Sequence, residues 1–343
     1  MPPRASLCRA VLPALAAVAF LSAVFIVSPP AAEVRGAAIQ TKTQSGERKK
    51  PVKPELDTRG APQEDQKQYR IGVRVDLVVV YASVTDKNGH FVSGLTKENF
   101  SVFEDGVQQE ITAFSQEDVP LSVGFVLDTS GSMRNKFNTV TRAALAFIRA
   151  SNTQDQVFLI GFNDEVELIE DFTNDVDLIA DSLENTIVTG GTALYDAIYL
   201  GVQKAGSGAH QKKAIVVFSD GEDRDSYYKL EELVAKVQES DVQIYSIGFL
   251  NPVPEKGLFG RWSKSVPEKA HDALQQISDE TGARAFFPKD LSEICAMVGE
   301  VAHELRNQYG IGYVSMNTAQ DGSWRRIRIM LNKDAPAGSQ VRH

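Results

Sequence analysis

The spacing of hydrophobic positions divides the chain into regions with different periods. From Ile71 the pattern changes to VRVDLVVVYASVTDKNGHFVSGLTKENFSVFEDGVQQEITAF, in which apolar and polar positions alternate and β-branched residues are frequent. A period of two predicts strands, and the turn signals DKNGH and EDGVQ divide this stretch into about four strands of an antiparallel sheet. After Gln308 the pattern returns in YGIGYVSMN and RRIRIMLN, on either side of a turn at QDGSW. Both regions are therefore expected to be β structure.

Between about residues 121 and 307, short apolar runs alternate with stretches of helical spacing. LSVGFVLD, DQVFLIGF, KAIVVFSD and DVQIYSIGF have the apolar character of parallel strands that are buried on both faces. The helical stretches are KFNTVTRAALAFIRAS, DVDLIADSLENTI, ALYDAIYLGVQKAG, KLEELVAKVQES and HDALQQISDETG, and EVELIED has the pattern of an antiparallel edge strand. The expected fold class is therefore α/β, with a doubly wound, mostly parallel sheet.

These patterns predict the domain organisation. We expect an α/β domain at 119–307 that is inserted in or flanked by a small β-sandwich. The two parts of the sandwich are residues 70–118 and 308–343, since each part alone would be small and poorly buried. Residues 33–69 have scarcely an apolar side chain to bury and are expected to form a disordered linker.

Residues 1–32 have the composition of an export signal. Arg4 and Arg9 precede an apolar stretch, AVLPALAAVAFLSAVFIV, which is followed by SPPAAE and polar sequence. This order predicts a secretory signal peptide, and the length of the apolar stretch leaves an uncleaved signal anchor as the alternative. We therefore expect a secreted, periplasmic or cell-envelope protein, with or without an N-terminal anchor.

The formal net charge of −9 limits the partners that the chain can have. Nucleic acids and anionic membrane surfaces are bound by clustered Lys and Arg side chains. We therefore expect no nucleic-acid partner, and membrane contact only through an uncleaved N-terminal anchor. An acidic chain more naturally binds cations.

Oxygen-bearing side chains follow two of the predicted parallel strands. Asp128 ends the strand LSVGFVLD and is followed by Ser130 and Ser132, whereas Asp220 ends the strand KAIVVFSD. A Gly-Gly bend in TGGTALYDA places Thr192 at the start of a helix. Loops at the carboxyl ends of parallel strands meet on one edge of a sheet, so we expect these five side chains to lie together. Taken alone, DTSGS is equally explained as a turn that caps the following helix.

These loops resemble the metal-ion-dependent adhesion site of von Willebrand factor A domains, whose pattern is an Asp-x-Ser-x-Ser loop, a separate Thr and a separate Asp. The resemblance covers roughly residues 119–307. It implies that Ser130 and Ser132 bind the metal directly, and that Asp128, Thr192 and Asp220 bind it directly or through water. The flanking sequences VTDKNGHFVSGLTKENFSVFEDGVQQEITAF and LRNQYGIGYVSMN are similar to segments of bacterial secreted proteins called VWFA-related proteins of acidobacterial type.

The type of ligand indicates the metal and the kind of partner. Carboxylate and hydroxyl oxygens without His or Cys suit a hard cation, so Mg²⁺ is the expected cofactor, with Mn²⁺ or Ca²⁺ as alternatives. Neutral hydroxyl ligands leave the ion under-neutralised, and the group that best matches its open position is a carboxylate. We therefore predict an adhesion or scaffold module, not an enzyme, that binds a protein ligand presenting Asp or Glu.

Two other functions stay open. One is a structural envelope or matrix protein in which the metal serves stability alone. The other is a phosphatase, because VLDTSGS followed by FSDGEDRD is also similar to haloacid-dehalogenase-type phosphotransferases. Those enzymes have a second Asp where this chain has Ser130, so the general acid is missing. Walker, GxSxG and HExxH patterns do not occur in the sequence.

The sequence offers two further candidates for binding. The segment NPVPEKGLFGRWSKSVPEK, 251–269, follows a predicted strand. Its Leu258, Phe259 and Trp262 are either part of a partner-binding edge or a loop that packs over the domain. Asp223 and Asp225 are either ligands of a second cation or solvated loop charges.

Overall fold

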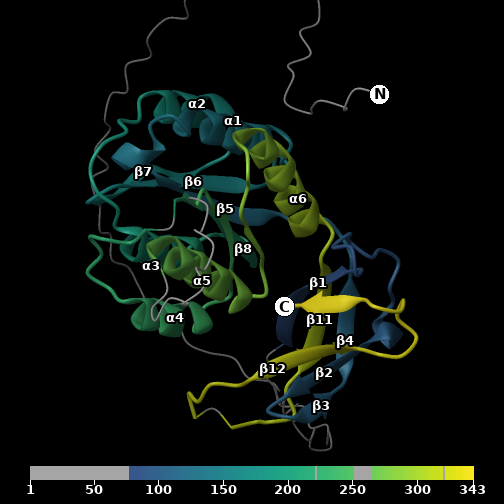
Figure 1. Cartoon of the computed structure of the whole chain (residues 1–343). Coiled ribbons are helices and arrows are strands. Elements are labelled where there is room, and N and C mark those ends of the chain that lie inside the picture. Colours follow the sequence, from purple (N-terminus) through teal and green to yellow (C-terminus); the bar gives the residue numbers. More distant parts are fainter. Residues whose placement is uncertain (1–76, 221, 251–264, 320) are drawn as a thin grey trace, which may run out of the picture. The chain divides into compact units, whose positions relative to one another are not determined.

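The computed structural model describes four stretches of the chain, which are residues 77–220, 222–250, 265–319 and 321–343. All four belong to one compact unit (Figure 1). The predicted signal segment, the predicted linker and the residues Leu258, Phe259 and Trp262 lie outside the described residues. Among the helices of these four stretches, none has the length and apolar character needed to cross a lipid bilayer.

A six-stranded, mostly parallel sheet forms the centre of the α/β domain. Its strand order is β10-β9-β8-β5-β6-β7, and every neighbouring pair is parallel except β6 and β7. The sequence prediction of a doubly wound sheet with an antiparallel edge at EVELIED is confirmed. The strands are β5 (Leu121–Asp128), β6 (Gln156–Phe162), β7 (Val166–Thr173), β8 (Lys212–Ser219), β9 (Val242–Gly248) and β10 (Ala285–Phe286).

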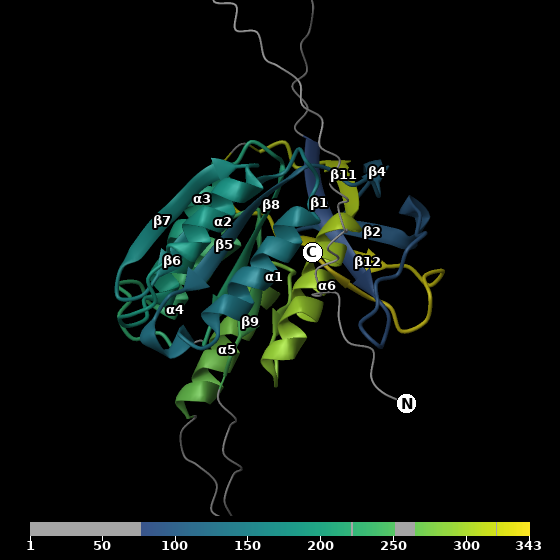
Figure 2. The same cartoon turned by 90° about the horizontal axis from the view of Figure 1, so that it is seen from above.

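Helices cover both faces of this sheet. One hydrophobic core lies between the sheet and α1, α2 and α6, and a second core lies between the sheet and α3, α4 and α5 (Figure 1). On the first face α1 and α6 lie side by side (Figure 2). The α-helices are α1 (Phe137–Arg149), α2 (Val176–Glu184), α3 (Leu194–Gly206), α4 (Leu230–Gln238), α5 (Val266–Asp279) and α6 (Ile294–Arg306). Short 3₁₀ turns occur at η1 (Lys97–Asn99), η2 (Gly131–Met133) and η3 (Leu291–Glu293).

Strand β5 supplies side chains to both cores. Phe125 and Leu127 pack in the core of α1, α2 and α6, whereas Val126 packs in the core of α3, α4 and α5. Successive side chains of a strand point to opposite faces of its sheet, so a strand that is covered on both faces needs a continuous apolar run. All eight residues of β5 are buried, and the strand ends with Asp128 at the carboxyl edge of the sheet.

Two small antiparallel sheets form a β module from residues 77–115 and 309–342. One sheet has the order β13-β1-β11-β4, and the other has the order β12-β2-β3. Strands from the two sides of the α/β domain pair with each other, β1 with β11 and β2 with β12. The strands are β1 (Leu77–Thr85), β2 (Phe100–Glu104), β3 (Val107–Gln109), β4 (Ile111–Ser115), β11 (Tyr309–Val314), β12 (Ile327–Leu331) and β13 (Gln340–Arg342).

The core and turns of the β module follow from its sequence. Phe100, Phe114 and Tyr309 contact one another through their rings, with centroids 5.3–5.7 Å apart. The predicted turn EDGVQ connects β2 to β3, and Asp105 and Gly106 both have positive φ values, +48° and +84°. Two positive φ values are typical of the tight Asp-Gly hairpin turn, which matches the twist of the strands that it joins.

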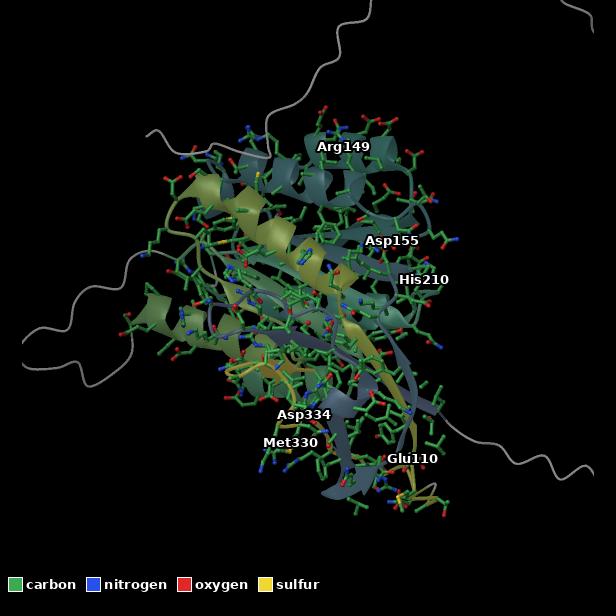
Figure 3. All side chains as sticks on the ribbon, turned by 90° about the vertical axis from the view of Figure 1, so that its right-hand side faces the viewer. Glu110, Arg149, Asp155, His210, Met330 and Asp334 are labelled. Atoms are coloured by element: carbon green, nitrogen blue, oxygen red, sulfur yellow. The ribbon has the colours of Figure 1, made fainter. Side chains whose placement is uncertain are left out.

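Ion pairs fix the end of α6 to the start of the central sheet. Asp155 lies just before β6 and is buried (Figure 3). Its carboxylate accepts a hydrogen bond from Leu121 N at 3.0 Å and forms an ion pair with Arg306, the last residue of α6. The ammonium of Lys212, at the start of β8, is also buried and donates to the carbonyl oxygen of Leu305. These contacts hold the segment where the α/β domain continues into β11.

Candidate metal centre

Asp128 is the innermost of the predicted ligands. Its side chain is fully buried, and both of its carboxylate oxygens accept hydrogen bonds. Ser130 N donates to Oδ1 at 2.9 Å, and Ser219 Oγ donates to Oδ2 at 2.7 Å. Burial raises the pKa of the Asp128 carboxyl and the nearby Asp220 raises it further, whereas the hydrogen bonds from Ser130 and Ser219 lower it. The net effect is a raised pKa. The residues around Asp128 therefore do not fully offset the cost of burying its negative charge.

The loop after β5 presents two hydroxyl groups next to each other. Ser130 is buried and Ser132 is exposed, and their Oγ atoms lie 3.0 Å apart. The loop continues as the 3₁₀ turn η2, and the buried side chain of Met133 anchors that turn in the hydrophobic core. The hydroxyl pair therefore lies at the boundary between the buried Asp128 and the solvent.

Backbone hydrogen bonds connect this loop to the loop that carries Thr192. Thr189 N donates to Thr129 O at 2.7 Å, and Gly131 N donates to Gly190 O at 3.2 Å. Gly190 has a φ of +89°, a backbone conformation that residues other than glycine rarely adopt. A Cβ placed there would lie 2.1 Å from Asp164 Oδ1. The Gly-Gly bend predicted from TGGTALYDA thus forms, and it brings the chain to the buried Thr192 just before α3.

Asp220 comes from the third loop, directly after β8. Leu127 of β5 is paired with Phe218 of β8, so the two strands end side by side and the following residues share one edge of the sheet. The side chain of Asp220 is 14% exposed, and its Oδ2 lies 4.0 Å from the ammonium of Lys136. We use the term rim for the three loops that carry Asp128 to Ser132, Thr192 and Asp220.

Residues after Asp220 hold Thr192 in place. Asp225 Oδ2 accepts a hydrogen bond from Thr192 N at 2.7 Å, and Arg224 N and Asp225 N donate to Thr192 O at 3.0 and 3.2 Å. Asp223 Oδ1 accepts from Tyr195 N at 3.2 Å, in the first turn of α3. Asp223 and Asp225, for which the sequence left a second cation and solvated charges open, therefore both bind backbone N–H groups at the start of α3.

Sequence reasoning missed three residues that shape the rim. Ser219 supports Asp128, Asp225 supports Thr192, and Lys136 faces Asp220. Ser219 and Asp225 belong to the FSDGEDRD stretch already singled out, so that stretch contained a signal for them. Lys136 lies four residues after Ser132 in a polar stretch, and only the fold reveals what its ammonium faces.

The donor set of the rim fits a hard divalent cation. Octahedral Mg²⁺ binds oxygens at about 2.0–2.1 Å, which places adjacent ligand oxygens about 2.9 Å apart, close to the separation of the Ser130 and Ser132 hydroxyls. Two carboxylates on the same rim supply negative charge, one of them buried. Nowhere in the described stretches do three or more His, Cys, Asp or Glu side chains form a group that could hold a metal ion. The rim is a different kind of site, with hydroxyl oxygens beside two carboxylates.

Comparison with known families identifies the α/β domain. Residues 122–300, more than half of the 343-residue chain, match the sequence profile of the von Willebrand factor type A domain. The chain belongs to this family. The matched residues of the A domain include all three loops of the rim.

Individual relatives are distant. A protein of Synechocystis sp., the uncharacterized protein sll0103, is 29% identical over 140 residues, which cover 38% of this chain and 32% of the relative. This chain thus matches about a third of that protein's length. An aerotolerance-related membrane protein from Bacteroides fragilis is 19% identical, with a TM-score of 0.42 over 54% of this chain and 98% of that chain. The vWF domain of the type V pili tip protein Mfa5 from Porphyromonas gingivalis is 12% identical, with a TM-score of 0.44 over 54% and 95% of the two chains.

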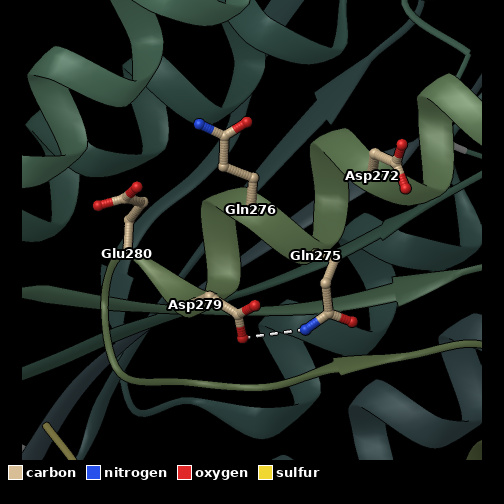
Figure 4. Close-up of a pocket in the computed structure, with 5 residues that line it drawn as sticks. All are labelled: Asp272, Gln275, Gln276, Asp279 and Glu280. Carbon is tan, nitrogen blue, oxygen red and sulfur yellow. Dashed lines mark hydrogen bonds between the residues drawn. The ribbon is translucent and has the colours of Figure 1, made fainter.

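Two cavities in the described part of the chain lie away from the rim. A depression of about 460 Å³ on α5 is lined by Asp272, Gln275, Gln276, Asp279 and Glu280, and Gln275 donates to Asp279 at 2.9 Å (Figure 4). A larger cavity of about 1440 Å³ is lined by residues of α1, η3, α6 and the segment 85–91, together with Arg284. Neither cavity is lined by a predicted metal ligand, so cavity size does not identify the candidate site.

Proposed function

We propose that this chain is an exported adhesion or scaffold module that binds a partner protein through a divalent cation, Mg²⁺ in the first place and Mn²⁺ or Ca²⁺ as alternatives. The cation is held by Asp128, Ser130, Ser132, Thr192 and Asp220, directly or through water. The observation that carries the proposal is the pair of hydroxyls 3.0 Å apart, on the same rim as a buried and a partly exposed carboxylate.

The residues of the rim divide the work of holding a cation. Ser130, which is buried, and Ser132, which is exposed, offer neutral hydroxyl oxygens. Asp128 is fixed by two hydrogen bonds and supplies negative charge from the buried side of the site. Asp225 and the Gly190 bend position Thr192. A bound cation supplies an electrophilic coordination position at the surface, and an Asp or Glu of a partner is the protein group that best fits a hard, under-neutralised cation.

Two exposed apolar side chains beside the rim fit a protein partner. Ile187 is 77% exposed and precedes Thr189, whose N–H binds Thr129 O. Tyr227 is 84% exposed and follows Asp225 by two residues. Exposed aromatic side chains such as Tyr227 are common anchors of protein interfaces, and Ile187 adds apolar surface. A partner segment with an acidic residue flanked by apolar side chains therefore matches the rim.

The same residues support binding better than catalysis. Ser130 stands where phosphatases of the haloacid dehalogenase type have a second Asp, and both oxygens of Asp128 accept hydrogen bonds. A structural envelope protein with a stabilising metal is the competing function. The two differ in whether removal of the metal ends partner binding while the fold persists.

A capture experiment tests the proposal. The purified chain is immobilised and exposed to an envelope extract in Mg²⁺ and in EDTA, in parallel with Thr192→Ala. Thr186→Ala is the matched control, because Thr186 precedes the same Gly-Gly bend and its hydroxyl donates to Ser182 O at 2.9 Å. The proposal predicts a partner that is retained by wild type and Thr186→Ala in Mg²⁺, and lost in EDTA and with Thr192→Ala. Identical retention in all four conditions would contradict it, and loss of folding in EDTA would favour the structural function.

A further inference from the structure

A lysine side chain reaches the candidate metal centre from the start of α1. Lys136 is fixed by its backbone, since Lys136 N donates to Met133 O at 2.8 Å and Val140 N donates to Lys136 O at 3.1 Å. Its ammonium lies 4.0 Å from Asp220 Oδ2 and 5.8 Å from the ring centroid of Phe249. The side chain is 26% exposed, so the charge is only partly screened by water.

This ammonium and a divalent cation would compete for the same negative charge. In the part of the chain that the structure describes, Lys136 forms an ion pair with Asp220, and the more exposed guanidinium of Arg224 also interacts electrostatically with this carboxylate. A lysine ammonium is a compact point charge on a flexible stem, so it can neutralise a carboxylate and also move away from it. Phe249 offers the ammonium a second favourable contact, because a cation is attracted to the face of an aromatic ring.

We propose that Lys136 competes with the divalent cation for Asp220 and thereby sets the metal affinity of the rim. The inference rests on the proposed function, since it concerns the same site. With the metal absent, the ammonium offsets the charge of Asp220 beside the buried Asp128. With the metal bound, the ammonium adds one positive charge beside the doubly charged ion. It therefore weakens metal binding and makes the metal-loaded site more attractive to a carboxylate.

The proposal predicts opposite effects of one substitution in the two states. Lys136→Met keeps an apolar side chain of similar length over Phe249 and removes the charge. The dissociation constant for Mg²⁺ is expected to fall about tenfold. The substitution removes a positive charge that lies near the ion and is only partly screened by water. In EDTA the same variant is expected to melt about 2–4 °C lower than wild type, since Asp220 loses its ion pair.

Lys204 provides a matched control in the same domain. Its ammonium also pairs with an aspartate, Asp171, at 2.5 Å, and also lies over an aromatic ring, Phe172, at 5.0 Å. Neither partner belongs to the rim. Lys204→Met should therefore leave the Mg²⁺ dissociation constant within about twofold of wild type. Lys136→Arg, which retains the positive charge, should do the same.

Isothermal titration of the purified chain with MgCl₂, followed by thermal melting in EDTA, tests the inference. The expected result is a lower dissociation constant for Lys136→Met alone, with a difference from wild type that becomes smaller at high salt. Equal or weaker binding by Lys136→Met, with clear binding by wild type, would overturn the inference and leave the proposed function standing. No binding by wild type or by either Lys136 variant would overturn both. If Lys136→Met does not fold, Lys136→Gln replaces it in the same titration.

Discussion

The hydroxyl of Ser219 donates a hydrogen bond to Oδ2 of Asp128 at 2.7 Å, across the ends of β8 and β5, and both side chains are fully buried. Residues 91 positions apart in the sequence thus meet at the carboxyl edge of the sheet. The contact fixes the carboxylate in one orientation, with its other oxygen bound to Ser130 N. The rim therefore depends on a residue that is not itself a predicted ligand.

Ser219→Ala is expected to lower the free energy of unfolding by about 1–3 kcal/mol, because it leaves a buried carboxylate oxygen without its donor. Urea unfolding at pH 7 measures the change. Ser207→Ala is the control, since Ser207 is exposed and its hydroxyl binds Lys204 O at 2.7 Å. That variant should stay within about 0.5 kcal/mol of wild type. Equal effects of the two substitutions would show that the Ser219 contact has no special role.

Gly190→Ala is expected to disturb the bend that positions Thr192. The φ of +89° is strained for alanine, and the new Cβ would lie 2.1 Å from Asp164 Oδ1. We expect a loss of at least about 1 kcal/mol in the free energy of unfolding, together with weaker Mg²⁺ binding. Gly206→Ala, with no heavy atom within 4 Å of its Cβ, should be neutral or slightly stabilising. Wild-type Mg²⁺ affinity in Gly190→Ala would mean that the bend does not position a ligand.

Arg306→Met is expected to destabilise the chain by about 3 kcal/mol, because it leaves the buried carboxylate of Asp155 without its cationic partner. The control is Lys213→Met, which breaks an ion pair of 2.7 Å with Asp241, whose side chain is 62% exposed. An exposed pair of that kind contributes less than about 1 kcal/mol. Chemical denaturation of both variants tests the difference, and similar losses would contradict the assignment of a buried pair.

The buried Lys212 predicts a dependence of stability on pH. Burial and the nearby Arg306 lower its pKa from 10.5 to about 8, against the opposing influence of Asp118 and Asp155. Between these values the unfolded chain holds the proton that the folded chain has lost, so the free energy of unfolding rises with pH. The gap corresponds to about 3 kcal/mol, at about 1.4 kcal/mol for each pH unit. Below pH 8 both states are protonated and this dependence disappears.

Unfolding of wild type and Lys212→Met at several pH values between 7 and 10.5 tests this prediction. The free energy of unfolding of wild type should rise relative to that of the variant across this range. A difference between the two proteins that stays constant would show that the ammonium of Lys212 is not destabilised in the folded chain.

The fold class could be predicted because the burial of a strand determines which of its positions must be apolar. Strands covered on both faces must be apolar throughout, as in LSVGFVLD, and β6 and β8 show the same requirement. Elements with weaker requirements were missed. β10 has two residues and β13 has three, too few for a period to appear. Helix α5 begins at Val266, before the predicted HDALQQISDETG, because Ser265 and Glu268 cap it and Pro267 is favourable in a first turn.

The five predicted ligands could be selected because two of their loops follow predicted strands and all five positions match the pattern of the metal-ion-dependent adhesion site. Their supporting residues could not, since a hydrogen bond such as Asp225 to Thr192 joins positions 33 residues apart. Lys136 is the clearest case. The sequence around Lys136 indicates only that a helix begins there. Its electrostatic role depends on Asp220 and Phe249, which lie in two other loops.

The most direct test of the account is an anomalous diffraction map from crystals of the chain grown with Mn²⁺, which scatters anomalously and prefers the same oxygen ligands. The account predicts one strong peak on the rim, within bonding distance of Ser130 Oγ and Ser132 Oγ, with one coordination position open to water or to a carboxylate from another molecule. The peak should be absent in Thr192→Ala crystals grown in the same way. A map with no peak at the rim of the wild-type chain at saturating Mn²⁺ would contradict the central claim that these loops hold a divalent cation.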